Sequence, residues 1–305
     1  MLSFQQLVQI LPQQLVFGIT LGMIYGLIAL GYTMVYGVLF MINFAHGDVF
    51  MIGAYMGWAV LVAIINTQFV PLNPILVLPL MLVPAMLFTG AIGLGLERFA
   101  YRPLYLRGAT RLGPLISAVG ASIFLQNAVM LNQGARMKVL MTYRLFPRTW
   151  RFDLFGVSIS YLVVVIAVIC GAMMWGLYIL VQKTTLGRSI RAVAEDREIA
   201  AVMGVNVWGV VSTTFLIGSA LGGAAGVLVG LYYTQIDFLM GYSAGLKAFT
   251  AAVLGGVLLG IIESLASTFI NPAFKDAISF GVLILVLVFR PGGILGESLP
   301  EWRRV

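Results

Sequence analysis

Long runs without a charged residue constrain this chain more than any other feature of its sequence. No Asp, Glu, Lys or Arg precedes Asp48, and none lies between Asp48 and Glu97. Residues 154–182 and 199–236 are also free of charge. Several of these runs exceed the roughly 20 apolar residues that a helix needs to cross a bilayer. Hydrophobic residues make up 61% of the chain and charged residues 10%, so we expect an all-α polytopic membrane protein.

The apolar runs predict about eight transmembrane helices, within a single transmembrane domain that covers residues 1–305. The expected elements lie near residues 11–36, 49–65, 74–96, 112–133, 159–182, 207–231, 245–270 and 277–289. The last element is too short to cross a membrane alone. Because the number of crossings gives no single consistent topology, we expect a broken or re-entrant piece near residues 40–50 or 245–260.

A polar segment, residues 184–206, interrupts the apolar runs and must lie outside the hydrocarbon. Leu186, Ile190 and Val193 recur at helical spacing, which predicts a short amphipathic helix. Asp196 and Glu198 favour the start of a second short helix, and Gly204 suits a left-handed cap that ends it. We interpret residues 184–206, called the docking segment below, as a surface for a cytoplasmic partner. An ordinary solvated loop is the alternative.

The distribution of basic residues predicts which side each loop occupies. A loop after residue 96 carries Arg98, Arg102, Arg107 and Arg111, and the positive-inside rule places it in the cytoplasm. The loop at residues 134–158 is equally basic but lies one span away. Since the docking segment needs the cytoplasmic side, the order of spans places loop 134–158 outside, against the charge rule.

Polar residues inside the apolar runs are candidates for a solute pathway. The stretch NFAHGD, residues 43–48, is either a tight turn between two spans or a broken helix that lines a cavity. Asp48 would be costly at membrane depth and therefore functional there, but unremarkable at the interface. Ser122 and Gln126 share one helix face, beside Asn127. They either bond a neighbouring helix or line a polar path.

Glycines recur every fourth residue in two of the spans. The first ladder is Gly18, Gly22 and Gly26, and the second is Gly218, Gly222, Gly226 and Gly230. Glycines at this spacing let another helix approach closely. We interpret both ladders as helix-packing faces, with contact to a solute as the alternative.

The chain lacks the motifs of common catalytic sites. It contains no GxxxxGK[ST] phosphate loop, no HExxH and no GxSxG, and it holds one cysteine and one histidine. We therefore expect no enzyme activity, no metal site and no cofactor. The net charge of +7 fits lipid head groups and topology rather than nucleic acid. Transport driven by a separate ATPase fits best; a stand-alone channel or secondary carrier and a purely structural scaffold are the alternatives.

Several motifs of the chain resemble those of the branched-chain amino acid permeases, the LivH/LivM type of ABC transporter subunit. They are LGRSIRAVAED at 186–196 with MGVN at 203–206, GYTMVYG at 31–37, INFAHG at 42–47, KAFTAAVLGG at 247–256 and RPGGILG at 290–296. The stretches ER at 97–98, YRP at 101–103, LISA at 115–118 and FLQN at 124–127 are similar to the LivH branch in particular. One departure is that Gly256 runs directly into VLLG, where relatives usually carry about a dozen further residues that include a GSIPGA-type segment.

The resemblance implies one permease of an ATP-driven importer for branched-chain or other amino acids in the bacterial cytoplasmic (inner) membrane. Its expected partners are a second, LivM-like permease, two cytoplasmic ABC ATPase subunits, an external substrate-binding protein and membrane lipid, without nucleic acid. A urea or short-amide permease of the same scaffold is the alternative. By analogy, ATPase coupling falls to Arg191, Glu195, Asp196, Ala200 and Gly204. The translocation pathway falls to Asn43, His46, Gly47, Gln126 and Asn127.

Overall fold

The computed structural model describes residues 4–67, 72–109, 112–147, 149–154, 157–269 and 274–289. Within them, six helical stretches are long and apolar enough to cross a membrane. These are α1 (Phe4–Leu39), α2 (Ala45–Thr67), α3 (Pro74–Gly95) with its continuation, α5 (Leu112–Gln133), α6 (Tyr161–Lys183) and α9 (Val207–Tyr233). The chain is therefore an all-α, multi-pass membrane protein, as the apolar runs predicted.

The C-terminal part contains the broken piece that the sequence predicted. Helices α10 (Met240–Leu254) and α11 (Gly256–Phe269) meet at Gly255 with a bend of 119°. Gly255 has a φ of 83°, a left-handed conformation that costs glycine little. Counted as one bent span, the pair raises the number of candidate spans in the described part to seven. Helix α12 (Lys275–Phe289) is a shorter apolar element.

The basic stretch after residue 96 is helical, which corrects the loop expected there. Helix α3 continues through a π-helical turn, η1 (Leu96–Tyr101), into α4 (Arg102–Leu106). Glu97 is fully buried, and its carboxylate accepts a hydrogen bond from the Ser212 hydroxyl of α9 at 2.8 Å. A π-helical turn shifts the side chains that follow it around the helix. Composition alone does not reveal that Glu97 points inward and bonds a residue of a distant helix.

Helix α9 is the centre of the bundle and packs against α1, α2 and α3. Other parts of the same chain pack against its glycine ladder along the length of the helix. A Cβ at Gly218 would lie 2.8 Å from the Gly31 carbonyl oxygen of α1, and one at Gly226 would collide with the backbone of α2 at Phe50. Gly222 faces the ring of His46, and Gly230 faces Ile236 and Leu140. Small residues allow this close approach, which drives helix association in lipid.

The glycine ladder of α1 meets α11. A Cβ at Gly22 would lie 2.5 Å from the Val257 Cα, and one at Gly18 would lie 2.9 Å from the Ile261 Cα. Gly256 and Gly260 of α11 face the backbone of α1 in return, so two GxxxG faces pack on each other. A Cβ at Gly26 would meet the side chain of Met174 on α6.

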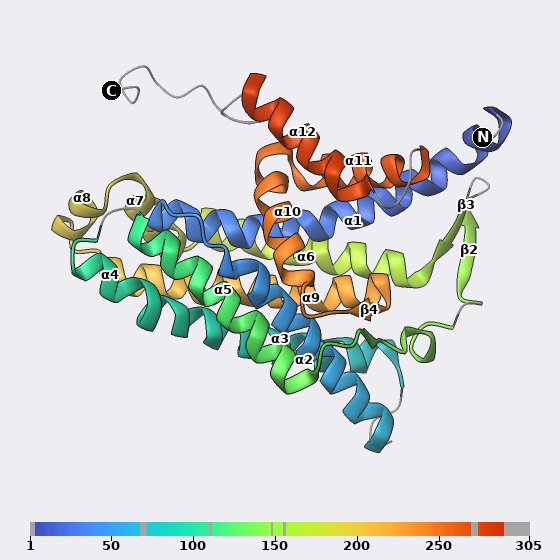
Figure 1. Ribbon diagram of the computed structural model, residues 1–305, viewed down its shortest axis with the longest axis horizontal. Coiled ribbons are helices and arrows are strands. Elements are labelled where there is room, and N and C mark those ends of the chain that lie inside the picture. Colours follow the sequence, from blue (N-terminus) through green and yellow to red (C-terminus); the bar gives the residue numbers. More distant parts are fainter. Residues whose placement is uncertain are drawn as a thin grey trace.

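The short elements gather at the two ends of the bundle (Figure 1). Helices α7 (Thr185–Glu195), α8 (Arg197–Val202) and α4 lie at one end. The opposite end carries β2 (Arg151–Leu154) and β3 (Val157–Ser160), which form an antiparallel hairpin. There β1 (Lys138–Val139) also pairs with β4 (Gln235–Ile236). The one-turn helix η2 (Thr142–Arg144) follows β1 in the chain. The two basic stretches thus lie at opposite ends, which is the arrangement that the order of spans predicted.

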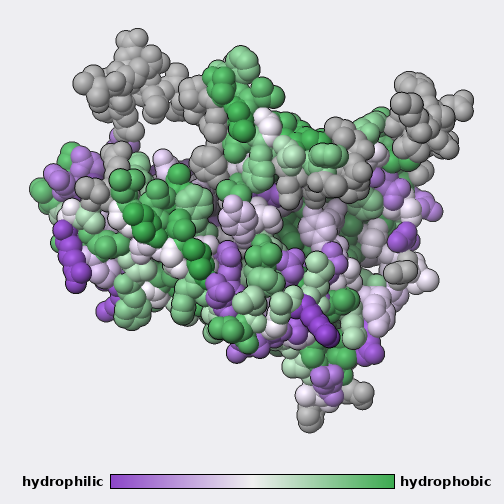
Figure 2. Space-filling model, in the orientation of Figure 1, coloured by the Kyte–Doolittle hydropathy of each residue, from purple (hydrophilic) through white to green (hydrophobic). Residues whose placement is uncertain are grey.

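The surface has the pattern expected of a membrane protein. Hydrophobic residues cover much of the face in Figure 2, while strongly hydrophilic residues lie at the end with α7 and α8, along the lower edge and at the opposite end. Helix α5 contributes an exposed apolar row: Ile116, Val119, Ile123 and Phe124. Arg111 and the motif at residues 290–296 lie outside the described residues.

Candidate docking and translocation sites

The docking segment forms two helices whose starts are capped by side chains. The Thr184 hydroxyl accepts a hydrogen bond from the Gly187 N–H at 3.0 Å and caps α7. The Asp196 carboxylate accepts hydrogen bonds from the N–H groups of Glu198 and Ile199, at 2.8 and 2.9 Å, and caps α8. Such caps satisfy N–H groups that a helix start leaves without a partner. The predicted helix start at Asp196 is confirmed.

The end of α8 is set by glycine, also as predicted. Gly204 has a φ of 84°, and its N–H donates to the Ala201 carbonyl at 3.0 Å. The Val205 N–H donates to the Ala200 carbonyl at 2.9 Å. This pair of bonds is a Schellman motif, in which a left-handed residue closes the helix. The local sequence therefore fixes the shape of the segment.

The tip of α8 presents apolar side chains that the sequence analysis did not single out. Ile199, Val202 and Met203 are 63%, 86% and 77% exposed. They lie next to the charged residues of the docking segment, and this end of the bundle is hydrophilic (Figure 2). Apolar groups in such a place are typical of a protein contact. The signal in the sequence was the run IAAVM on a helix only six residues long.

The residues assigned to coupling by analogy occupy different positions in this segment. Arg191 and Glu195 are exposed on α7, and the Arg191 guanidinium donates to the Val181 carbonyl of α6. Asp196 is the cap of α8, and Gly204 ends that helix. Ala200 is buried at 3% exposure. A partner could therefore touch Arg191 and Glu195 directly, whereas Ala200 supports α8 from within.

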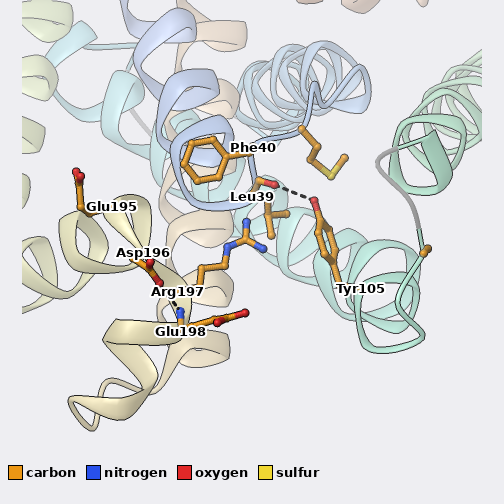
Figure 3. Close-up of a pocket in the computed structure, with 9 residues that line it drawn as sticks. Leu39, Phe40, Tyr105, Glu195, Asp196, Arg197 and Glu198 are labelled. Atoms are coloured by element: carbon orange, nitrogen blue, oxygen red, sulfur yellow. Dashed lines mark hydrogen bonds between the residues drawn. The ribbon is translucent and has the colours of Figure 1, made fainter. Parts of the chain in front are cut away.

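A cavity of about 420 Å³ separates the docking segment from the end of α1. Figure 3 shows Arg197 crossing this space between the rings of Phe40 and Tyr105. The wall on the side of the docking segment is acidic, and the opposite wall is mostly apolar. The lining residues are Leu39, Phe40, Met41, Tyr105, Ala109, Glu195, Asp196, Arg197 and Glu198.

The polar stretch at residues 43–48 lies inside the bundle. After Leu39 the chain folds back, so that His46 packs beside Gly31, which is eight residues from the end of α1 and thus about 12 Å along the helix. Asn43, His46 and Asp48 are all buried, and the Tyr101 hydroxyl donates to Asn43 Oδ1 at 2.7 Å. Of the two expected arrangements, the structure shows the turn: α1 and α2 are each long enough to span a membrane, and the polar groups where they meet are buried in the protein.

Gly47 belongs to the same contact. A Cβ at this position would meet the backbone of α10 at Gly245, only 2.7 Å away. The start of α2 and the start of α10 therefore touch backbone to backbone. A side chain at position 47 would separate them.

A second cavity, of about 360 Å³, opens beside this contact, between α5 and α10. Its walls are largely apolar, with one polar corner formed by Ser122 and Gln126. The lining residues are Phe44, Val119, Ser122, Ile123, Gln126, Tyr242, Gly245 and Leu246.

Asp48 connects the buried break to this cavity. The Gln126 amide nitrogen donates to Asp48 Oδ1 at 3.0 Å and to the Ser122 hydroxyl at 3.3 Å. The other carboxylate oxygen, Oδ2, is buried without a hydrogen-bond partner among the described residues. Asn127 points elsewhere, since its amide donates to the Ile123 carbonyl of its own helix at 2.8 Å. The structure thus joins Gln126 to residues 43–48 and leaves Asn127 apart.

A buried ion pair lies at the other break, and neither the motifs nor their spacing predicted it. Lys247 of α10 and Glu263 of α11 lie 3.0 Å apart. The hydroxyl groups of Tyr25 and Ser279 also donate to Glu263, at 2.9 and 2.7 Å. Four helices therefore meet at one carboxylate. Within the described residues, no group of His, Cys, Asp and Glu is arranged to hold a metal ion.

Comparison with known proteins agrees with this architecture. The family model described as "Branched-chain amino acid transport system / permease component" matches residues 14–287. The chain is 45% identical to the high-affinity branched-chain amino acid transport system permease protein BraD of Pseudomonas aeruginosa, over 96% of this chain and 97% of the relative. It is 42% identical to LivH of Escherichia coli K12 over the same shares. No solved structure matches the chain.

Proposed function

The chain belongs to the branched-chain amino acid transport system permease family, and we propose that it is a pathway-forming subunit of an ATP-driven importer for branched-chain amino acids. It would act in the bacterial inner membrane and would not itself be an enzyme. A chain without a phosphate loop does not hydrolyse a nucleotide in the usual way, so ATP-driven transport takes its energy from another subunit. The exposed apolar tip of α8, at the polar end of a membrane bundle, is the single observation that carries this proposal.

The docking segment supplies the surface for the ATPase. Val202 and Met203 offer apolar anchors, and Arg191 and Glu195 offer charges beside them. An apolar centre with a polar rim is the usual anatomy of a protein interface. We assign the contact with two ATP-hydrolysing subunits to this end, one docked on each permease.

The cavity between α5 and α10 supplies the chain's share of the pathway. Its apolar walls suit an aliphatic side chain, and the corner at Gln126 suits the polar end of an amino acid. The cavity is open towards the exposed face of α5, where a second, LivM-like permease would close it. The substrate-binding protein would approach the opposite end, at the β2–β3 hairpin.

Co-purification from detergent-solubilised membranes, followed by uptake in proteoliposomes, tests the proposal. The wild-type complex should contain an ATPase and import labelled leucine only with ATP. Val202→Asp should remove the ATPase, because it places a charge in the apolar contact. Glu195→Lys should weaken coupling without unfolding the protein, and Lys183→Glu, a charge reversal outside the segment, serves as the control.

Other outcomes separate the alternatives. Uptake by the purified chain alone, without ATP, would indicate a channel or secondary carrier. Import of urea in preference to leucine would indicate a short-amide permease. An ATPase bound without any solute movement would indicate a scaffold. Each of these results would replace the proposed function.

A further inference from the structure

Arg197 links the docking segment to the end of α1. It is the first residue of α8, and its guanidinium donates a hydrogen bond to the Val38 carbonyl. The guanidinium carbon also lies 6.0 Å from the ring centroid of Phe40 and 5.4 Å from that of Tyr105. Figure 3 shows the side chain reaching from α8 across the cavity to these rings. One side chain therefore touches helices that are far apart in the sequence.

The chemistry at the end of α1 suits an arginine. The last carbonyl groups of a helix have no partner within it, and this end carries the negative pole of the helix dipole. A guanidinium donates hydrogen bonds to such carbonyl groups, and its positive charge is attracted to the negative pole. The rings of Phe40 and Tyr105 add cation–π attraction. The Tyr105 hydroxyl donates to the neighbouring Leu39 carbonyl at 2.8 Å, so the same turn is held from two sides.

The clamped turn leads directly into the buried polar stretch. Phe40 follows it with a φ of 53°, a conformation that is rare for a bulky residue. Three residues later, Asn43 is bonded to Tyr101, and α2 then begins with His46 and Asp48 in its first turn. Only a few residues therefore join the end of α1 to the corner of the cavity between α5 and α10.

The other arginines of the docking segment make no comparable connection. Arg188 is exposed on α7, and Arg191 donates to Val181, a residue of the preceding helix. Arg197 reaches across 159 positions of the sequence to Val38. Its neighbours Glu195 and Glu198 line the same cavity, yet in the described part of the chain Arg197 forms no salt bridge with them.

We propose that Arg197 is a positioning residue that transmits movement of the docked ATPase to the break between α1 and α2. The inference rests on the proposed function. The cavity gives the guanidinium room to move, and Glu198, which lines the same cavity, is an alternative partner when α8 shifts. Two discrete partners for one cation make a two-state contact, which is what a switch requires.

The test compares three variants in the reconstituted complex, for ATPase content, ATP hydrolysis, leucine uptake and melting temperature. Arg197→Met keeps the length of the side chain but loses its charge and hydrogen bond. It should retain the ATPase and ATP hydrolysis while uptake per ATP falls about tenfold, the factor expected for one charged hydrogen bond. Arg197→Lys keeps the charge but lacks the planar guanidinium. Its uptake per ATP should lie between that of the wild type and that of Arg197→Met. Arg107→Met, at an exposed arginine that lies outside the docking segment and does not line the cavity, is the matched control and should behave like the wild type.

The possible results separate this inference from the proposed function. Unchanged uptake per ATP in Arg197→Met, an equal loss in Arg107→Met, or loss of the ATPase from Arg197→Met would overturn the role of Arg197 alone. A wild-type chain that binds no ATPase would overturn the proposed function and this inference with it. If Arg197→Met fails to fold, Tyr105→Phe decides: it removes the bond to Leu39 but keeps the ring, and uptake per ATP should fall about threefold. No change in Tyr105→Phe would then refute the transmission.

Discussion

The two breaks in the membrane helices differ in how their polar groups are satisfied. At the first break, residues 40–44 between α1 and α2, both ring nitrogens of His46 and one oxygen of Asp48 are buried without a partner among the described residues. At the second break, at Gly255, Lys247 and Glu263 form an ion pair. Tyr25 and Ser279 add hydrogen bonds to that pair.

The difference indicates different roles. A buried charge is costly unless it is paired, so the compensated cluster at the second break stabilises one arrangement of α1, α10, α11 and α12. The first break is held by close packing on α9, and its buried polar atoms lie next to Gln126, which lines a cavity. Ionisable groups inside membrane-spanning helices are characteristic of a functional site. We therefore expect substitutions at the second break to affect folding, and substitutions at the first to affect transport.

The largest effect should follow from breaking the ion pair. Glu263→Leu leaves the Lys247 ammonium buried without its carboxylate, which should cost about 3–5 kcal/mol. The melting temperature and the yield of monodisperse protein in detergent measure this loss. The double variant Lys247→Met/Glu263→Gln should recover most of it, because it removes the charge and keeps acceptors for Tyr25 and Ser279. A wild-type melting temperature for Glu263→Leu would contradict the structural role.

Filling the glycine ladder of α9 should be nearly as damaging to folding, because it disturbs the packing of α9 on α2 rather than the polar groups of the first break. Gly226→Leu forces a side chain into the backbone of α2 at Phe50, at a cost of about 3 kcal/mol, the upper end for overpacking. The melting temperature and the yield of monodisperse protein measure this loss. Gly120→Leu is the matched control, because nothing lies within 4 Å of a Cβ at position 120. Equal stability of the two leucine variants would show that the ladder is not a tight contact.

Asp48→Asn should separate transport from folding. The carboxylate accepts a hydrogen bond from Gln126, and an amide oxygen can accept the same bond, so the replacement should change the stability by less than about 1 kcal/mol. Leucine uptake should nevertheless fall about tenfold, because the polar corner loses its charge. Uptake and melting temperature are measured on the same preparation. A large loss of stability with normal specific uptake would make the first break structural, like the second.

The smallest effect is expected at the cavity wall. Gln126→Leu removes the amide that joins Ser122 and Asp48, and uptake should fall about threefold to fivefold. Asn127→Leu is the control, because the Asn127 amide bonds only its own helix and is exposed. Initial uptake rates at several leucine concentrations distinguish the two variants. A greater loss in Asn127→Leu would place the pathway on the other face of α5.

The sequence by itself determined the membrane class, the spans and the shape of the docking segment. Hydropathy and helix caps depend on neighbouring residues, which is why the start at Asp196, the left-handed Gly204 and the broken piece near Gly255 could all be predicted. The tertiary structure decided which helices fill the glycine ladders, that Glu97 turns inward, and that Lys247 meets Glu263. It also brought Arg197 to Val38 and Gln126 to Asp48. These pairs depend on how helices that are distant in the sequence pack together. Helical periodicity predicts which face of its helix a residue lies on, but not which residue it contacts.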